Sequence, residues 1–339
     1  MHAAVRALAA AAVVCSVAAA HGADIGSDAT RIATAGQARR PAITAVSHIA
    51  VYAADLAKTE SFYVHDLGAV KGPDPESPQG VNQDVNQGVN QGVRYYFAPT
   101  QFVEVLPLPL ATGGAASINR LDHVAFVTAS AEELRAYLAR QMPVPARVQR
   151  GHDGSEWFDV LDPEGNKIQF VQPPRQPPEI PLNTLSNHII HIGFIIHDRS
   201  REDRLFRAVL GFRPYWFGGM RDDAPTWISQ QVPDGTDWLE YMVVGKPQER
   251  GIPTTMSAAE LGVLDHFALG IANAEAAYTL LWNGARLTGQ SNVPKIGRDA
   301  KWQLNLLDPD GTRAELMELH AIGTPCCSPF TASDPPSQP

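Results

Sequence analysis

Four histidines recur in four similar apolar segments of this 339-residue chain. The segments are residues 46–51, 121–126, 189–194 and 264–269, and the histidines are His48, His123, His191 and His266. His48 and His123 lie 75 positions apart, as do His191 and His266, and the two pairs are offset by 143 positions. Because chance does not readily give two matching pairs, we predict a repeat of four modules in two halves.

A second set of polar residues lies in apolar segments that we predict to be the last strand of each module. They are Glu104, Gln169, Glu240 and Glu315. An acid within an apolar strand costs stability unless it is paired or binds an ion. Histidine and glutamate in the same register therefore require a partner or an ion, although histidines can also be satisfied within a core.

Strand alternation puts one small residue on the same face as each histidine, two positions later. These small residues are Ala50, Ala125, Gly193 and Ala268. We expect them to border a cavity beside each imidazole, with the bulky residues of the other face packed under a helix.

Each histidine strand is followed by a helical pattern, at residues 57–67, 131–141, 201–210 and 274–282. Asp-Pro turns at residues 161–165 and 307–311 then precede an apolar strand. The predicted unit is a strand, a helix and several further strands. Residues 80–93 break this pattern with a Val-Asn-Gln tandem, which we interpret as an expanded loop tip.

Over residues 43–319, these motifs resemble the vicinal oxygen chelate superfamily of glyoxalases, extradiol dioxygenases, and fosfomycin and bleomycin resistance proteins. The resemblance implies an α+β fold, in which tandem βαβββ modules form two curled mixed-sheet, glyoxalase-like domains. We expect these segments: a signal peptide (1–20), a flexible tether (21–42), an N-terminal domain (43–172), a Pro-rich linker (173–186), a C-terminal domain (187–320) and a disordered tail (321–339).

The resemblance also implies the ligands of a divalent metal, which could be Zn, Ni, Mn, Co or Fe(II). The C-terminal half offers the complete set, which is His191, Glu240, His266 and Glu315. The N-terminal half offers a degenerate second set, which is His48, Glu104, His123 and Gln169. Gln169 weakens that second site, because an amide is a poorer ligand for a hard cation.

The resemblance implies three functions. The first is a lyase or isomerase that stabilises an enediolate, with Glu240 or Glu315 as general base. The second is an extradiol ring-cleavage dioxygenase using Fe(II) on His191, His266 and Glu315. Such enzymes place a further histidine in the later strands of the third module, and residues 212–244 contain none. The third is a non-catalytic small-molecule binding or resistance protein.

The composition narrows the partners and the location. A formal net charge of −9 argues against nucleic acid, so we expect a small-molecule substrate; pairing into a homodimer is left open. Arg6 followed by the apolar residues 7–20 is typical of a signal peptide, which predicts export to the periplasm or the medium. At 14 residues this run is shorter than the roughly 20 that span a bilayer, so we expect no integral membrane segment after cleavage.

Two smaller groups of residues leave their roles open. Lys295, Arg298 and Lys301 form a basic cluster that could bind a carboxylate or phosphate or belong to a solvated loop. Cys326 and Cys327 are adjacent, and adjacent residues rarely reach disulfide geometry without backbone strain, so they receive no function.

Overall fold

The computed structural model describes residues 39–76, 92–110, 114, 117–244, 256–287 and 293–336. The chain from Arg40 onward forms one compact unit. The predicted signal peptide, the tether up to residue 38 and most of the Val-Asn-Gln loop lie outside the described residues.

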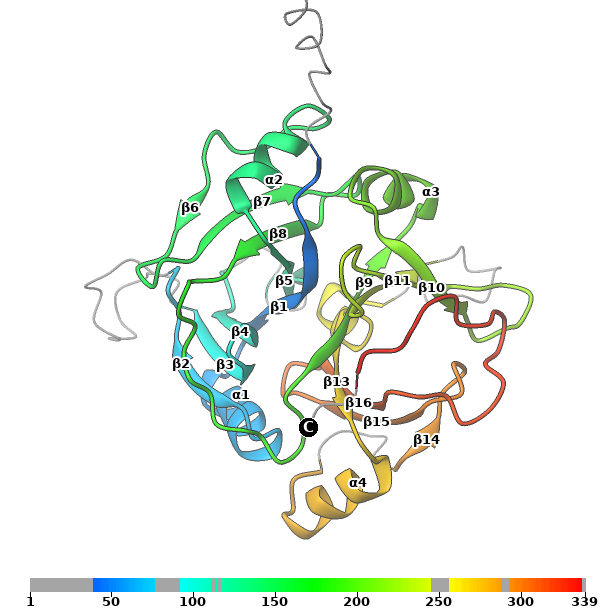
Figure 1. Ribbon diagram of the computed structural model, residues 1–339. Helices are drawn as coiled ribbons and strands as arrows, with labels where there is room; N and C mark the ends of the chain where they lie inside the picture. Colours follow the sequence, from blue (N-terminus) through cyan, green and yellow to red (C-terminus); the bar gives the residue numbers. More distant parts are fainter. Residues whose placement is uncertain are drawn as a thin grey trace, which may run out of the picture. The chain divides into compact units, whose positions relative to one another are not determined.

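Two eight-stranded mixed sheets with the same connectivity form this unit (Figure 1). Their strand orders are β2-β3-β4-β1-β5-β8-β7-β6 and β10-β11-β12-β9-β13-β16-β15-β14. In each sheet the two histidine-bearing strands are central and antiparallel, and each also pairs in parallel with the last strand of its own module. The sequence prediction of tandem βαβββ modules in an α+β fold is confirmed.

The first sheet and its helices come from the N-terminal half. Their bounds are β1 Ile43–Ala53, α1 Leu56–Glu60, η1 Ser61–Asp66, β2 Val70–Pro73, β3 Val93–Ala98, β4 Gln101–Pro107, β5 Leu121–Thr128, α2 Ala131–Leu138, β6 Gln149–Arg150, β7 Glu156–Leu161 and β8 Lys167–Gln172.

The second sheet and its helices come from the C-terminal half. Their bounds are β9 Ile189–Ile196, α3 Arg199–Asp203, η3 Arg204–Val209, β10 Arg213–Gly218, β11 Trp227–Gln231, β12 Trp238–Val243, η5 Ala258–Val263, β13 His266–Ile271, α4 Ala274–Asn283, β14 Lys295–Ile296, β15 Trp302–Leu307 and β16 Arg313–Glu318.

Each module helix begins at a polar residue that caps it. Asp55, Ser130, Asp198 and Asn273 each accept a backbone N–H of the first turn. The first and third helices continue as π-helical turns, η1 and η3. Each of these helices begins within two residues of the predicted first residue.

Two polar residues bridge the sheets. Gln101 of β4 accepts the N–H of Ile189 at 3.0 Å and donates to its carbonyl at 2.9 Å. Asp237, immediately before β12, accepts the N–H of Val46 at 3.0 Å. Gln101 precedes Phe102, which pairs with His48, and Asp237 precedes Trp238, which pairs with His191. Gln101 Nε2 donates to Asp237 Oδ2 at 3.3 Å.

Residues 321–336, which we expected to form a disordered tail, run along the outer strand β10. Thr331 N donates to Tyr215 O at 2.9 Å, and Phe217 N donates to Ser328 Oγ at 2.9 Å. Asp334 forms an ion pair with Lys301 at 2.8 Å. This segment is ordered because its polar groups form hydrogen bonds with the backbone N–H and C=O groups at the edge of the sheet.

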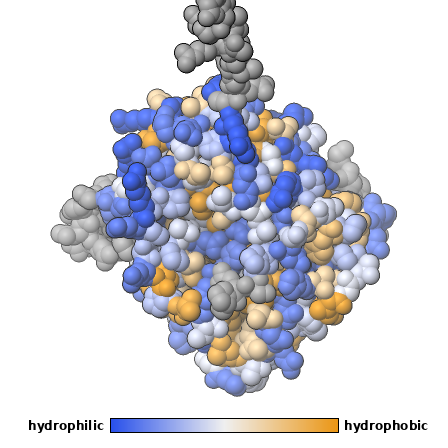
Figure 2. Space-filling model, in the orientation of Figure 1, coloured by the Kyte–Doolittle hydropathy of each residue, from blue (hydrophilic) through white to orange (hydrophobic). Residues whose placement is uncertain are grey.

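No helix among the described residues is long and apolar enough to cross a membrane. On the face drawn in Figure 2, apolar residues occur in small separate groups between hydrophilic ones. This face therefore offers no single large apolar patch.

Candidate metal centre

Strands β9, β13 and β16 bring His191, His266 and Glu315 together in the second sheet. His191 Nε2 lies 3.0 Å from His266 Nε2, and Glu315 Oε2 lies 3.6 Å and 3.9 Å from these two nitrogens. All three residues are buried. Glu240 of β12 approaches from the side, with Oε2 3.4 Å from His266 Nε2. The four ligands that the resemblance implied for this half are neighbours.

Strand register explains how the two imidazoles meet. His266 lies opposite Gly193 across the β9–β13 pair, and Ala268 lies opposite His191. A Cβ on Gly193 would lie 2.2 Å from His266 Cε1, so only glycine leaves room for the ring. Our expectation of a cavity beside each histidine was therefore wrong. The small residue instead makes space for the imidazole of the neighbouring strand.

The hydrogen bonds of His266 fix which nitrogen is free to bind a cation. His266 Nδ1 lies 2.7 Å from the Leu264 carbonyl, which only accepts, so Nδ1 carries the proton and Nε2 presents a lone pair. Burial lowers the pKa of His191 and of His266 well below the usual value, and this favours the neutral, ligating form.

Orphaned buried atoms show that a cation fits this group. His191 Nδ1 and Glu315 Oε1 have no hydrogen-bond partner among the described residues. Burial raises the pKa of Glu315 to about 7, although the charge of Arg313 opposes the shift. The four distances between ligand atoms given above are all below twice the ~2.1 Å of a metal–ligand bond, so one divalent ion could contact both atoms of each pair.

A cavity of ≈ 390 Å³ opens onto this group. Glu240 and Glu315 form part of its wall, together with side chains from β11, β14, β15 and the turn after β14. A cavity of this size accommodates a small organic molecule beside the metal ligands.

The N-terminal sheet repeats the histidine geometry. His48 Nε2 lies 2.9 Å from His123 Nε2 and 3.9 Å from Glu104 Oε2. The fourth residue, Gln169, turns its amide nitrogen toward Glu76 Oε2 at 3.3 Å. The second set of residues therefore lies together as the first set does, with the amide of Gln169 in the position that Glu315 has in the other sheet.

Arg94 of β3 occupies this second site, and the sequence analysis missed it. Its guanidinium lies 3.3 Å from Glu104, 3.2 Å from Asp74 and 2.6 Å from Glu76, and it stacks over Phe102 at 4.2 Å. The pairing partner of Glu104 is thus an arginine, whereas Glu240 pairs with the much smaller Ser229. An arginine within the apolar strand Val93–Ala98 was the available signal.

The basic cluster of the sequence analysis divides in two. Lys295 and Arg298 line the cavity, whereas Lys301 is fully buried and points away from it, toward Tyr215 Oη at 3.0 Å and Asp334. Lys301 is therefore a structural anchor for the C-terminal segment.

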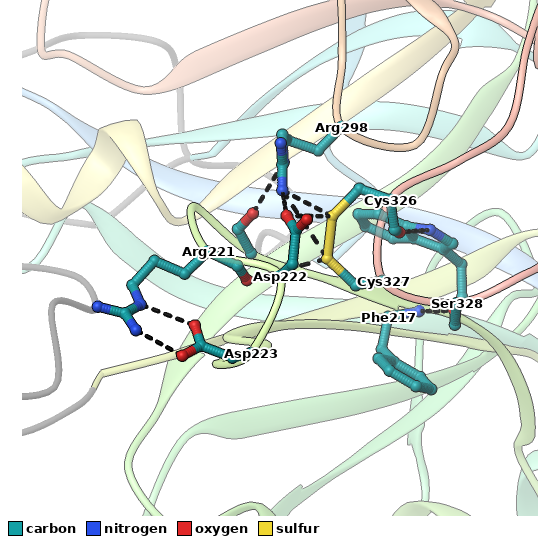
Figure 3. The surroundings of a disulfide bond; sticks show 10 residues. Phe217, Arg221, Asp222, Asp223, Arg298, Cys326, Cys327 and Ser328 are labelled. Atoms are coloured by element: carbon teal, nitrogen blue, oxygen red, sulfur yellow. Dashed lines mark hydrogen bonds and ion pairs between the residues drawn. A yellow bond between two sulfur atoms is a disulfide. The ribbon is translucent and has the colours of Figure 1, made fainter.

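Cys326 and Cys327 form a disulfide beside Arg298, contrary to our expectation (Figure 3). Arg298 Nη2 donates to Cys326 Sγ at 2.8 Å and also pairs with Asp222, and Trp216 Nε1 donates to the Cys326 carbonyl at 3.1 Å. Cys326 N also donates to the Arg298 carbonyl at 2.8 Å, so hydrogen bonds join the C-terminal segment to the turn that carries Arg298.

No protein-family model and no curated protein matches the sequence. Solved structures do match the fold. The Mn(II)-bound glyoxalase from Novosphingobium aromaticivorans is 15% identical with a TM-score of 0.58, over 82% of this chain and 83% of that one. An extradiol ring-cleaving dioxygenase from B. fuscum is 18% identical with a TM-score of 0.54, over 87% and 76%. The 2,3-dioxygenase LapB from Pseudomonas sp. KL28 is 13% identical with a TM-score of 0.55, over 83% and 93%.

Together with the paired βαβββ modules, these matches show that the chain has the vicinal oxygen chelate fold, as the sequence resemblance predicted.

Proposed function

We propose that this protein is a divalent-metal-dependent enzyme that moves a proton on a small oxygenated substrate, as glyoxalase-type lyases and isomerases do. The grouping of His191, His266 and Glu315, with Glu240 beside them at the wall of one cavity, carries the proposal. The same fold in a Mn(II)-bound glyoxalase supports it. A bound divalent ion would polarise two neighbouring substrate oxygens and so acidify the adjacent C–H bond.

Glu240 is the general base of this proposal. Its side chain is 14% exposed, against 3% for Glu315, and its Oε1 accepts a hydrogen bond from Ser229 Oγ at 3.2 Å. Glu240 Oε2 takes the proton as the C–H bond breaks, and the electron pair moves into the adjacent carbonyl group. Returning that proton to the neighbouring carbon, while the hydroxyl proton moves to the other oxygen, completes an isomerisation. Glu315, the other candidate base, is buried and serves as a ligand only.

Proton exchange tests this role. Hydroxyacetone, which carries neighbouring hydroxyl and carbonyl groups, is incubated with metal-loaded protein in D₂O and followed by NMR. We expect exchange by the wild type and a loss of about 100-fold or more in Glu240→Gln with metal content unchanged. Glu275→Gln, on the exposed face of α4, is the control. Unchanged exchange in Glu240→Gln would overturn the role of Glu240.

Metal analysis of the purified chain tests the centre itself. We expect bound divalent metal that is lost in His191→Ala. A protein without stoichiometric metal, and with a His191→Ala variant of unchanged metal content, would instead favour a non-catalytic binding protein.

A ring-cleavage dioxygenase is the second candidate, because the tightest group consists of two histidines and one carboxylate. The histidine-free segment 212–244 argues against it. Oxygen uptake with catechol, after anaerobic loading with Fe(II), would favour this candidate over the first.

We also propose that the chain is exported and its leader removed. The apolar residues 7–20 and the Cys326–Cys327 disulfide, a bond typical of oxidising compartments, support this proposal. Mass spectrometry of the mature N-terminus after expression of the full chain tests it. The homodimer remains a prediction for sedimentation analysis.

A further inference from the structure

Arg313 is a cation of the cavity whose charge acts on Glu315 without forming a direct ion pair with it. It lies on β16 two positions before Glu315, so both side chains are on the same face of the strand, and both line the cavity. Among the described residues, the Arg313 side chain makes no hydrogen bond, and no carboxylate lies within 4 Å of it; its Nε is buried without a partner. An unpaired buried guanidinium donor is costly unless a ligand supplies the acceptor.

The other basic groups of the cavity are in different situations. Arg298 is held by Asp222 and by the Gly219 carbonyl at 3.2 Å. Lys295 lies exposed on the two-residue strand β14. Among the described residues of the cavity, Arg313 is therefore the basic residue whose buried N–H donor has no partner next to the metal ligands.

The charge balance of the cavity also favours an anion. If a divalent ion offsets Glu240 and Glu315, and Asp222 offsets Arg298, Lys295 and Arg313 remain against the single carboxylate of Asp299. Trp216, Trp227 and three methionines provide an apolar wall around these charges. The cavity thus suits a molecule with an apolar body and one anionic end.

We propose that Arg313 binds a carboxylate of the substrate, so that the cavity selects small carboxylic acids that also carry two neighbouring oxygens. This inference rests on the proposed function for the two oxygens, but its carboxylate contact stands on Arg313 alone. A guanidinium presents two parallel N–H donors, which match the two oxygens of a carboxylate.

A pair of isosteric ligands tests the contact. 3,4-Dihydroxybenzoate and 3,4-dihydroxybenzamide share the neighbouring oxygens and differ in the charged group. In anaerobic titration calorimetry of the Zn-loaded protein, we expect the benzoate to bind at least about tenfold more tightly. Arg313→Met should abolish this preference without changing the affinity for the amide, and Arg313→Lys should keep part of it. Arg207→Met, which removes an equal charge from η3, should preserve the full preference.

Equal affinities of the wild type for the two ligands, no binding of either, or a preference that survives Arg313→Met would overturn the carboxylate proposal. Metal content measured in parallel separates this result from the proposed function. If the chain takes up no metal, the proposed function fails, and titration with benzoate and benzamide, which lack the neighbouring oxygens, still decides the role of Arg313.

Discussion

At the scale of single residues, the two sheets contain the same pair of imidazoles in two electrostatic settings. In the second sheet Ser229 and Glu315 leave a compact group of donors with orphaned atoms. In the first sheet the matching positions are Arg94 and Gln169, and the guanidinium forms an ion pair with Glu104. Arg94 thus supplies the positive charge that an ion would supply in the other sheet.

Replacing these two residues should create a second metal site. In the double variant Arg94→Ser, Gln169→Glu, the first sheet would have two imidazoles and two carboxylates, and we expect a second divalent ion per chain by elemental analysis. The matched variant Arg94→Lys, Gln169→Glu keeps a cation in place and should bind no additional ion. A folded double variant with unchanged metal content would contradict the assignment of Arg94 as the internal cation.

Residue types and spacing predicted which side chains gather, because the repeat places His191, His266 and Glu315 in the same register. They could not predict Arg94 or Arg313 as members of the sites. Arg94 reaches Glu104 through strand pairing, and pairing partners cannot be read from one strand alone. Arg313 shares a strand with Glu315, but the strand pattern does not show that its side chain lines a cavity. The same limit led us to expect a void beside Gly193 where an imidazole lies.

At the scale of elements, helix α3 places a carboxylate in an apolar setting. Glu202 is fully buried, and neither of its oxygens has a partner among the described residues. Burial, together with the charges of Asp162 and Glu164, raises the pKa of Glu202 to about 8. The helical pattern predicted this element. It could not predict which carboxylate would be buried without a hydrogen-bond partner.

Glu202 should make the protein less stable as the pH rises. Its pKa is higher in the folded chain than its ordinary 4.5, so the folded state holds the proton longer, and stability is lost between about pH 4.5 and 8. Glu202→Gln should therefore raise the free energy of unfolding above pH 8 by on the order of 3 kcal/mol and change it little below pH 4.5. Urea unfolding across this range measures the effect. Glu133→Gln, exposed on α2, is the control, and equal pH dependence in the two variants would contradict the prediction.

At the scale of the whole compact unit, Gln101 and Asp237 hold the two sheets together by buried hydrogen bonds to backbone groups. The sequence predicted both sheets from the repeat. It could not predict this bridge, because the two residues become neighbours only when the sheets meet. Burial raises the pKa of Asp237, although its bonds to His188 and Val46 oppose the shift.

Removing the bridge should destabilise the unit as a whole. Gln101→Ala leaves the N–H and the carbonyl of Ile189 without their side-chain partner, and we expect a loss of about 1–3 kcal/mol in the free energy of unfolding. Guanidinium unfolding followed by tryptophan fluorescence measures this loss. Gln149→Ala, on the exposed strand β6, should change stability by less than about 0.5 kcal/mol. Equal losses in the two variants would show that the bridge contributes nothing.

The C-terminal segment also covers the edge of the second sheet, where a strand from another copy of the chain could pair. Strand β10 is the outer strand of its sheet, and residues 321–336 occupy the hydrogen-bonding groups of Tyr215 and Phe217 that a further strand would otherwise use. A chain shortened after Leu319 would expose this open edge together with the rings of Tyr215 and Trp216. Open edges of this kind recruit strands from other molecules, so the segment acts as a guard against aggregation.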